Sequence, residues 1–307
     1  MNVTFRQLRL FAALAQHRSI SEVARQFHVT QPTVSMQLRE LSDSIGLPLY
    51  EMTGKRLSLT AAGEELAQTA RHIGQEWADF EQRIAAMKGL TQGRLQVAVV
   101  STAKYFVPRM LGAFCRDYPE IDIALEVQNR DGVLQRLRDN LDDLVIMSTP
   151  PRDMDIVSQV FMPNPLVVTA PLSHPLVQQK NIPLTQLSGE RFILRERGSG
   201  TRLACDQHFE KAGFAPLVRL ELGSNEAIKQ AVAGGMGLAV LSRHALGEHL
   251  VDEALAVLDV DSFPIQSSWY IVYLQGKRLS PLAQAFLQYL SAHASDWRQR
   301  QPALPAT

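Results

Sequence analysis

Residues 30–46, TQPTVSMQLRELSDSIG, have the pattern of one short helix with marked ends. Thr30 can cap the first turn, and Pro32 lies within that turn, where a missing backbone N–H is tolerated. Gly46 closes the pattern, because glycine readily ends a helix. A preceding helical run, SEVARQFH, begins at Ser21. Two short helices joined by a brief turn predict a helix-turn-helix.

Short elements are predicted on both sides of this pair. Apolar residues three positions apart predict an earlier helix, and they are Phe5, Leu8, Phe11 and Leu14. After the pair, residues 47–60 form two short extended runs around a turn at Gly54, which predicts a two-stranded wing. Lys55 and Arg56 would project from the tip of that wing.

A long helix is predicted from Thr60 to about Lys88, where the sequence contains no proline. Its apolar residues alternate spacings of four and three, as in a heptad seam: Leu66, Ala70, Ile73, Trp77, Phe80, Ile84 and Met87. A second copy of the chain buries such a narrow seam most simply, although a helix packed on its own domain has the same pattern. The residues expected to make the dimer contact are Leu66, Ile73, Trp77, Phe80 and Ile84.

Strands alternate with helices beyond TQGR at 91–94, which has the composition of a hinge. The expected strands cover 95–100, 121–127, 143–149, 166–171, 191–194, 218–222, 237–242 and 269–274. Continuous Val, Ile and Leu runs separated by amphipathic helices predict parallel sheets covered on both faces, hence an α/β fold. The number of strands favours two α/β lobes over one sheet. Ligands of such folds bind outside the carboxyl ends of strands, often between lobes.

The composition is that of a folded globular protein. The chain has 307 residues, enough for two domains, and it is 46% hydrophobic and 20% charged. These values exclude disordered and collagen-like chains, and no apolar run is long enough for a membrane span. We therefore expect a cytoplasmic protein.

The charges are balanced over the whole chain but not within its first part. Lys plus Arg equals Asp plus Glu, at 31 each, while residues 1–60 hold seven basic and four acidic side chains. That small excess is compatible with a DNA-binding head.

No metal or cofactor is expected. Cys115 and Cys205 lie in no Cys-x-x-Cys or Cys/His cluster, so both are interpreted as buried, inert thiols. The eight histidines share no metal-ligand spacing.

At this point the motifs resemble a known family. Residues 19–66, SISEVARQFHVTQPTVSMQLRELSDSIGLPLYEMTGKRLSLTAAGEEL, resemble the winged helix-turn-helix of LysR-type transcriptional regulators. The order of head, long helix and two-lobed α/β domain covers the whole chain. Segments 99–114, 128–137 and 194–202 resemble, within that family, the regulators of Calvin-cycle (RuBisCO) carbon-fixation operons.

The resemblance implies a homodimer joined through the long helix and assembling into a homotetramer. It implies an effector domain like a periplasmic binding protein, where a small metabolite changes how the heads sit on double-stranded DNA. We expect an activator for which RNA polymerase is a candidate partner. Two residues depart from the family pattern: Met36 stands where Arg is common, which puts one DNA contact in doubt, and Ala62 replaces a usual Pro.

The predicted organisation has four parts: a winged helix-turn-helix over 1–59, a linker helix over 60–90, an effector-binding domain over 91–300 and a tail over 301–307. Within the effector-binding domain, the first lobe is expected at about 91–163 and 268–300, and the second at about 164–267.

The helix after Thr30 is the predicted DNA-reading element. Glutamine can bond adenine bidentately and a threonine methyl can touch thymine, so Gln31, Thr33 and Gln37 are the expected base readers. Phosphate contacts are expected from Thr30, Ser35, Arg39, Lys55 and Arg56, and Pro32 and Met36 complete the predicted set. Val34, Leu38 and Leu41 are expected on the core side. Each polar residue could instead be solvated helix surface.

An anion site is predicted between the lobes. Ser101 and Thr102 follow a strand and begin a helix, where free N–H groups and the helix dipole favour negative charge. In RERGSGTR the glycines let backbone amides approach a ligand, which suits a phosphate or carboxylate. The expected effector residues are Ser101, Thr102, Lys104, Arg130, Thr149, Arg197, Ser199, Thr201, Arg202 and Asn225. Ser and Thr at such places are also ordinary helix caps.

Two other classes of function are weighed against a regulator. A nucleotide-dependent enzyme would use the glycine-rich runs at 232–237 and 197–202, but neither is a GxGxxG after a strand, and no catalytic constellation stands out. A plain metabolite-binding protein would leave the DNA-binding head without a purpose.

Overall fold

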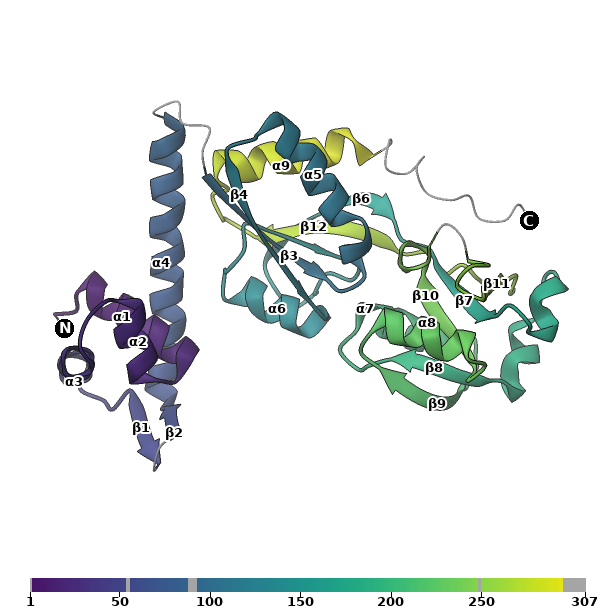
Figure 1. Ribbon diagram of the computed structural model, residues 1–307, viewed down its shortest axis with the longest axis horizontal. Helices are drawn as coiled ribbons and strands as arrows, with labels where there is room; N and C mark the ends of the chain where they lie inside the picture. The colour runs from purple at the N-terminus through teal and green to yellow at the C-terminus, as the bar shows by residue number, and fades with distance from the viewer. Residues whose placement is uncertain (1, 54–55, 88–92, 248–249, 295–307) are drawn as a thin grey trace. The chain divides into compact units, whose positions relative to one another are not determined.

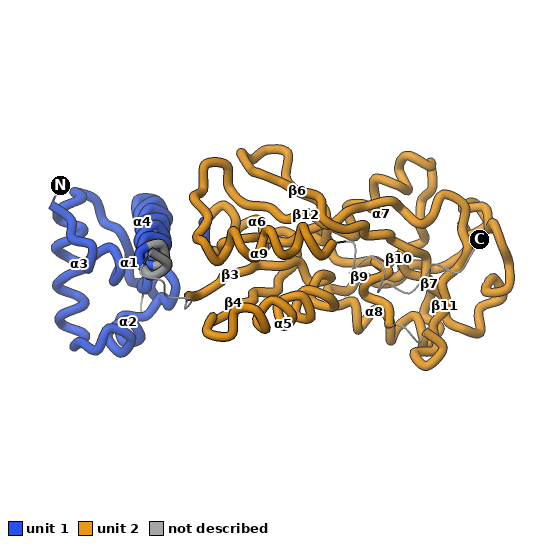
Figure 2. The backbone as a smooth tube through the Cα atoms, turned by 90° about the horizontal axis from the view of Figure 1, so that it is seen from above, with its two compact units in different colours: residues 1–84, 139–141 blue, residues 85–138, 142–307 orange. Residues whose placement is uncertain are grey.

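The computed structural model describes residues 2–53, 56–87, 93–247 and 250–294 (Figure 1). The chain divides into two compact units (Figure 2). Unit 1 comprises Met1–Ile84 and Asp139–Leu141, and unit 2 comprises Ala85–Arg138 and Asp142–Thr307. Gly54, Lys55, residues 91–92 of the expected hinge and the tail 301–307 lie outside the described residues.

Unit 1 contains four helices and a hairpin among its described residues: α1 (Phe5–His17), α2 (Ile20–Gln26), α3 (Gln31–Ile45), β1 (Tyr50–Thr53), β2 (Arg56–Leu59) and α4 (Ala61–Met87). Thr30 caps α3 by accepting from the N–H of Thr33, and Gly46 ends it at φ 81°. Strands β1 and β2 pair antiparallel, as expected of a wing. Thr60 accepts from the N–H of Gly63 at 3.1 Å and so caps α4.

Two expectations for the head are wrong in detail. Ser19, not Ser21, begins α2, because Ser19 Oγ accepts the N–H of Glu22. The residues of α1 three positions apart do not share one face: at 3.6 residues per turn, Phe5 and Leu14 lie half a turn apart around the helix. Leu14 is fully buried, whereas Phe5 is 37% exposed.

The first sheet of unit 2 has the order β4-β3-β5-β12-β6. Its strands are β3 (Gly93–Val100), β4 (Ile121–Gln128), β5 (Leu144–Met147), β6 (Ile156–Pro163) and β12 (Ser268–Leu274). The helices packed on it are α5 (Val107–Asp117), α6 (Arg130–Arg138) and α9 (Pro281–Ala292), and a short 3-10 turn, η1 (Ala103–Tyr105), follows β3. One apolar core, which includes Phe114, Trp269 and Phe286, joins this sheet to its helices and makes the first lobe.

The second sheet has the order β11-β7-β10-β8-β9. Its strands are β7 (Leu166–Pro171), β8 (Arg191–Arg195), β9 (Leu217–Leu222), β10 (Leu238–Ser242) and β11 (Leu255–Leu258). Helices α7 (Gly200–Lys211) and α8 (Asn225–Ala233) accompany it, with 3-10 turns η2 (Pro175–Gln178), η3 (Leu184–Gly189) and η4 (Arg243–Ala245). Two separate apolar clusters pack against this sheet, and together they form the second lobe.

The sheets are mixed, so the expectation of parallel sheets is wrong in part. Strand β3 pairs parallel with β4 and β5, but β12 pairs antiparallel with β5 and β6. In the second lobe, β7 runs antiparallel to β10 and β11. The chain leaves the first lobe through β6 and returns through β12, and the two crossings lie side by side, with the N–H of Asn164 bonded to Ser267 O at 2.8 Å.

Two strands, β6 and β11, were not anticipated. Strand β6 lies at the edge of its sheet and exposes Ser158, Gln159 and Val160, so it lacks a continuous apolar run. Strand β11 has only four residues. Among the described residues, no helix has the length and apolar character that a lipid bilayer requires of a crossing segment.

Candidate functional site

Helix α3 presents two different sides. Val34, Leu38 and Leu41 are buried in the head core, as expected from the sequence. The residues proposed to meet DNA are exposed or half-buried: Gln31, Pro32, Met36 and Arg39 are exposed, and Thr33, Ser35 and Gln37 are half-buried. The buried side therefore fixes the helix, and the polar side remains available to a partner.

The polar side of α3 is partly organised by its own contacts. Thr30 Oγ1 and Thr33 Oγ1 are 2.8 Å apart, and Gln37 Nε2 donates to Glu40 Oε2 at 2.8 Å. Arg39, and Arg56 at the start of β2, make no ion pair within the part of the chain that the structure describes. Both side chains are exposed, so their guanidinium groups are accessible to a phosphate.

The apolar seam of α4 divides into two parts. Leu66 packs against the head core, so that residue is partly covered within its own unit. Farther along the helix, Ile73, Trp77 and Phe80 are 40%, 50% and 45% exposed. The Trp77 ring lies 5.5 Å from that of Phe80.

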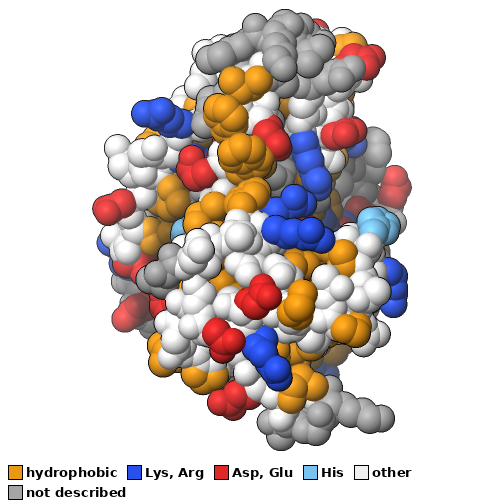
Figure 3. All heavy atoms as spheres, turned by 90° about the vertical axis from the view of Figure 1, so that its left-hand side faces the viewer, with side chains coloured by type: hydrophobic (Ala, Val, Ile, Leu, Met, Phe, Trp, Pro, Cys, Tyr) orange, Lys and Arg blue, Asp and Glu red, His pale blue; other side chains and the backbone are white. Residues whose placement is uncertain are grey.

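An apolar band of side chains is visible on the face of Figure 3. Phe5 belongs to the exposed apolar surface around α4, because its ring lies 5.7 Å from that of Trp77. Ile84 is half-buried. An exposed apolar stripe on a long helix is typical of a surface that a partner covers.

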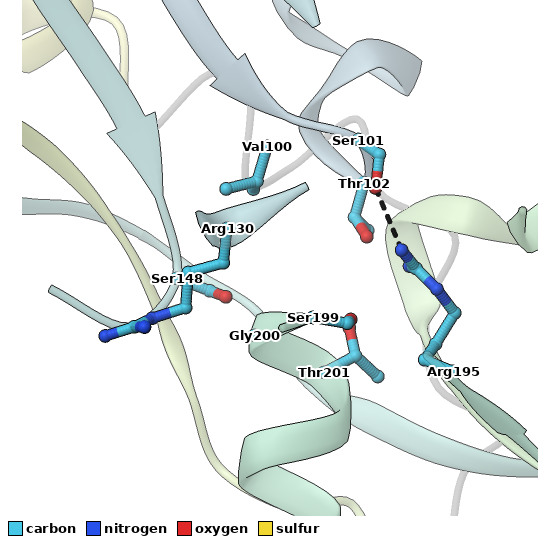
Figure 4. Close-up of a pocket in the computed structure, with 9 residues that line it drawn as sticks. All are labelled: Val100, Ser101, Thr102, Arg130, Ser148, Arg195, Ser199, Gly200 and Thr201. Atoms are coloured by element: carbon cyan, nitrogen blue, oxygen red, sulfur yellow. Dashed lines mark hydrogen bonds between the residues drawn. The ribbon is translucent and has the colours of Figure 1, made fainter. Parts of the chain in front are cut away.

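Unit 2 contains a polar pocket at the carboxyl ends of β3 and β8 (Figure 4). Its lining residues come from both lobes: Val100, Ser101, Thr102, Arg130, Ser148, Arg195, Ser199, Gly200 and Thr201. Five of the expected effector residues are brought together here, namely Ser101, Thr102, Arg130, Ser199 and Thr201. The free space is about 10 Å³, which is room for roughly one water molecule.

The start of α7 forms one wall of the pocket. Ser199 is buried and caps the helix, its Oγ accepting from the N–H of Arg202. A Cβ atom at Gly200 would lie 3.0 Å from Ser148 Oγ of the first lobe. Gly198 has φ 88°, and a Cβ there would collide with the Asp131 carboxylate. The glycines therefore let this helix start approach the first lobe closely.

Arg195 is the charged pocket residue that sequence reasoning missed, and Val100 and Ser148 also line the pocket without having been expected there. It ends β8, and it is only 3% exposed. Its guanidinium reaches across the pocket, with Nη2 donating to Ser101 Oγ at 3.1 Å (Figure 4). Nη1 donates to Asn225 Oδ1 at 2.7 Å, and Nε donates to Glu196 Oε2 at 2.8 Å. The sequence offered one signal for this residue: Arg195 ends the buried strand RFILR.

Asn225 does not line the pocket, but it supports it from the second lobe. Its Nδ2 donates to Thr102 Oγ1 at 3.3 Å, and its Oδ1 accepts from Arg195. Thr149 lies beside the pocket, where its carbonyl accepts from Arg130 Nε at 3.0 Å. The hydroxyl lining the wall at this point belongs to Ser148.

Arg202, expected to hold the anion, is directed elsewhere. Its Nε donates to Asp206 and its Nη1 donates to Glu221, both at 2.9 Å. Although burial would lower the pKa of Arg202, its bonds to Glu221 and Asp206 raise that pKa above the usual value. Arg202 is thus neutralised by two carboxylates and is absent from the pocket lining.

Two further expected effector residues lie off the pocket. Arg197 is exposed. The Lys104 ammonium lies 5.1 Å from the centre of the Tyr105 ring. Neither lines the pocket. The described residues also contain no cluster of His, Cys, Asp and Glu that could hold a metal ion.

Comparisons with known proteins match both units. Residues 5–64 match the model of the bacterial regulatory helix-turn-helix protein, lysR family, and residues 88–295 match the LysR substrate binding domain. A RuBisCO operon transcriptional regulator of Acidithiobacillus ferrooxidans is 47% identical, over 99% of this chain and 98% of that protein. The transcriptional activator CmpR of Synechocystis sp. is 45% identical, over 95% of this chain and 96% of that protein.

Solved structures agree with the fold. The regulatory domain of Synechocystis CcmR in complex with 2-PG is 50% identical, with a TM-score of 0.65, and the match covers 69% of this chain and all of that one. Full-length CbnR complexed with its target DNA has a TM-score of 0.69 over 94% of this chain and 99% of that one. At 22% identity, the CbnR likeness shows the fold alone.

Proposed function

Because this chain belongs to the LysR family of DNA-binding transcriptional regulators, we propose that it controls carbon-fixation genes in response to a phosphorylated metabolite bound between the lobes of unit 2. The protein is a regulator and not an enzyme. The observation that carries the proposal is the 47% identity, over 99% of the chain, to a RuBisCO operon regulator.

The chemistry of the pocket supports an anionic effector. Two arginines, Arg195 and Arg130, line it together with the N-terminal turn of α7. The Arg195 guanidinium reaches across the pocket, whereas Arg130 Nε donates to the Thr149 carbonyl beside it. Backbone N–H groups and the helix dipole at such a turn favour phosphate or carboxylate. The CcmR regulatory domain, 50% identical, is known in complex with 2-PG, which supports a phosphorylated ligand here as well.

We assign the main charged contact to Arg195, in place of Arg202. The Arg202 guanidinium is held by two carboxylates, those of Asp206 and Glu221, and lies off the pocket. Arg195 lines the pocket, is paired with one carboxylate, that of Glu196, and spends one donor on the neutral hydroxyl of Ser101. A phosphate oxygen is a stronger acceptor than a hydroxyl, because a charge-assisted hydrogen bond is shorter and stronger. An incoming anion can therefore exchange for Ser101 on the same guanidinium.

The head and the long helix supply the DNA-binding part of the proposal. Gln31, Thr33 and Gln37 read bases, and Arg39 and Arg56 hold phosphates, which fixes register on the duplex. The exposed stripe of Ile73, Trp77 and Phe80 is the surface that a second copy covers. We propose a homodimer that assembles into a homotetramer, acts in the cytoplasm and contacts RNA polymerase at its promoters. The domain boundaries expected from the sequence, 1–59, 60–90, 91–300 and 301–307, are part of this proposal.

The test uses the full chain with DNA from the region next to its own gene and from the promoters of carbon-fixation genes. Footprinting should show a protected site with interrupted two-fold symmetry, because two heads on a dimer meet two half-sites. Calorimetric titration with 2-PG should show saturable binding, and 2-PG should change the footprint. A sulfate titration is the control for unspecific anion binding. A protein that protects no such site, or binds 2-PG no better than sulfate, would contradict the proposal.

A further inference from the structure

A hydrogen bond outside the pocket joins the two lobes. The Tyr105 hydroxyl donates to Glu226 Oε1 at 2.6 Å. Tyr105 ends η1 in the first lobe, three residues after Thr102, and Glu226 lies in the first turn of α8 in the second lobe. Neither side chain lines the pocket. The contact therefore depends on the spacing of the lobes and does not involve a pocket residue.

The acceptor of this bond is held in place by a lysine. Lys229 Nζ lies 3.1 Å from Glu226 Oε2 and 3.3 Å from Glu253 Oε2, and the Lys229 side chain is only 9% exposed. The same ammonium lies 5.9 Å from the centre of the Tyr105 ring. Glu226 and the tyrosine ring are thus both positioned by one nearly buried cation.

The protonation states of the pair make the bond strong. Burial, and then the neighbouring Glu226 carboxylate, raises the pKa of Tyr105 well above its usual value. Burial alone would raise the pKa of Glu226, but the bonds from Tyr105 and Lys229 lower it. The phenol therefore stays protonated and the carboxylate stays ionised near neutral pH, which gives a charge-assisted hydrogen bond.

Three interlobe hydrogen bonds made by residues of the pocket, η1 and α8 require the same close spacing. They are Arg195 to Ser101 at 3.1 Å, Asn225 to Thr102 at 3.3 Å and Tyr105 to Glu226 at 2.6 Å. With these bonds made, the pocket has about 10 Å³ of free space. A phosphorylated metabolite is far larger than the single water that fits, so the lobes must separate or rotate to admit it.

The three bonds respond differently to an arriving anion. Arg195 lines the pocket and can exchange Ser101 for ligand oxygens, and Asn225 supports it from behind. Tyr105 and Glu226 gain nothing from the ligand, yet their bond is lost when the lobes move apart. The stability of this bond therefore counts fully against ligand entry, because a ligand shifts a conformational equilibrium only by its differential affinity.

We propose that Tyr105 and Glu226 form an interlobe latch that opposes effector binding and so sets effector affinity from outside the pocket. The inference rests on the proposed function of the pocket as an anion site. It assigns these two residues a positioning role. They hold the lobes at their close spacing, and ligand binding requires their hydrogen bond to break.

The first test compares Tyr105→Phe with Tyr118→Phe in the full chain. Tyr105→Phe removes only the latch hydroxyl, whereas Tyr118 packs on Phe114 in the first-lobe core and serves as the matched control. Calorimetric titration with 2-PG should show about 5- to 50-fold tighter binding for Tyr105→Phe and no change for Tyr118→Phe. Glu226→Gln should tighten binding less, because an amide oxygen still accepts, and the double variant should be non-additive. Weaker or unchanged binding in Tyr105→Phe overturns the latch.

The second test needs no effector. Spin labels report the interlobe distance when they are attached to Glu120→Cys in the first lobe and Glu210→Cys in the second. The variant also carries Cys115→Ser, and the labelled chains are diluted with unlabelled ones. Burial raises the pKa of Cys205, so that thiol resists labelling. Tyr105→Phe should broaden or lengthen the distance distribution, and an unchanged distribution overturns the latch. If 2-PG fails to bind any variant while the distances still change, the proposed effector is wrong and the latch stands.

Discussion

The DNA-reading helix and the interlobe pocket are built in opposite ways. In α3, every proposed contact lies within nine positions of Thr30, and the buried residues Val34, Leu38 and Leu41 follow one helical stripe. In the pocket, Ser101 bonds to Arg195 across a separation of 94 positions. The first site follows from the local periodicity of one helix. The second site forms only when both lobes have folded and packed together.

This difference predicts that the head can be destroyed without loss of the pocket. Leu38→Asp places a charge at a position that is 1% exposed, at a cost of several kcal/mol, which exceeds what a small domain tolerates. Operator binding should be abolished in gel-shift assays, while calorimetric binding of 2-PG to the same full-length variant is retained. Loss of both activities would show that the two regions do not fold independently.

The next largest effect is expected at the exposed apolar stripe of α4. Trp77→Asp puts a carboxylate where a second copy of the helix is proposed to pack, at a cost of several kcal/mol to the dimer. Light scattering should show dissociation, and operator affinity should fall at least 100-fold, because one head meets only one half-site. Glu76→Asp on the same helix is the control. If the Trp77→Asp protein stays dimeric with full operator affinity, the stripe is not part of the dimer interface.

Two arginines seven positions apart, Arg195 in the pocket and Arg202 outside it, separate what the sequence predicts from what the tertiary structure adds. Arg195→Ala should weaken 2-PG binding by about 10- to 100-fold, since it removes a charge-assisted contact, and should leave operator binding without metabolite intact. Arg202→Ala should change 2-PG affinity by less than about threefold, because Asp206 and Glu221 already occupy that guanidinium. The reverse ranking by calorimetry would restore Arg202 as the effector contact.

The smallest effects are expected within α3, where they divide by role. Gln31→Ala should reduce discrimination between operator and mismatched DNA by about 1–3 kcal/mol. Arg39→Ala should weaken binding to all sequences and lower the slope of log affinity against log salt by about one. Binding to operator and random duplexes at several salt concentrations separates the two. Identical behaviour of the variants would refute the division between base reading and phosphate contact.

The family and the two-lobed α/β class could be predicted from the sequence, and the comparisons confirm both. The helix ends at Thr30 and Gly46 were also predictable, because capping is a property of a few neighbouring residues. The start of α2 was misplaced by two residues, since Ser19 and Ser21 are equally good caps by composition and only the bond to Glu22 selects one.

Strand direction was decided by tertiary structure. A buried apolar run such as LVVTAP at β7 has the same composition whether its neighbours run parallel or antiparallel. Its antiparallel pairing with β10 and β11 follows from the path by which the chain crosses into the second lobe. Two strands at sheet edges were missed because β6 has three exposed residues in its middle and β11 has only four residues.

The sequence by itself determined which segments could hold an anion: helix starts with Ser or Thr after buried strands, rich in glycine and near arginine. Only the tertiary structure decided which arginine faces the pocket. Asp206 and Glu221 lie four and nineteen positions from Arg202, and their carboxylates draw it away. Arg195 is left to reach Ser101 of the other lobe. The physical reason is that a guanidinium's partners are fixed by distance in space, and sequence separation carries almost no information about that distance once two lobes are brought together.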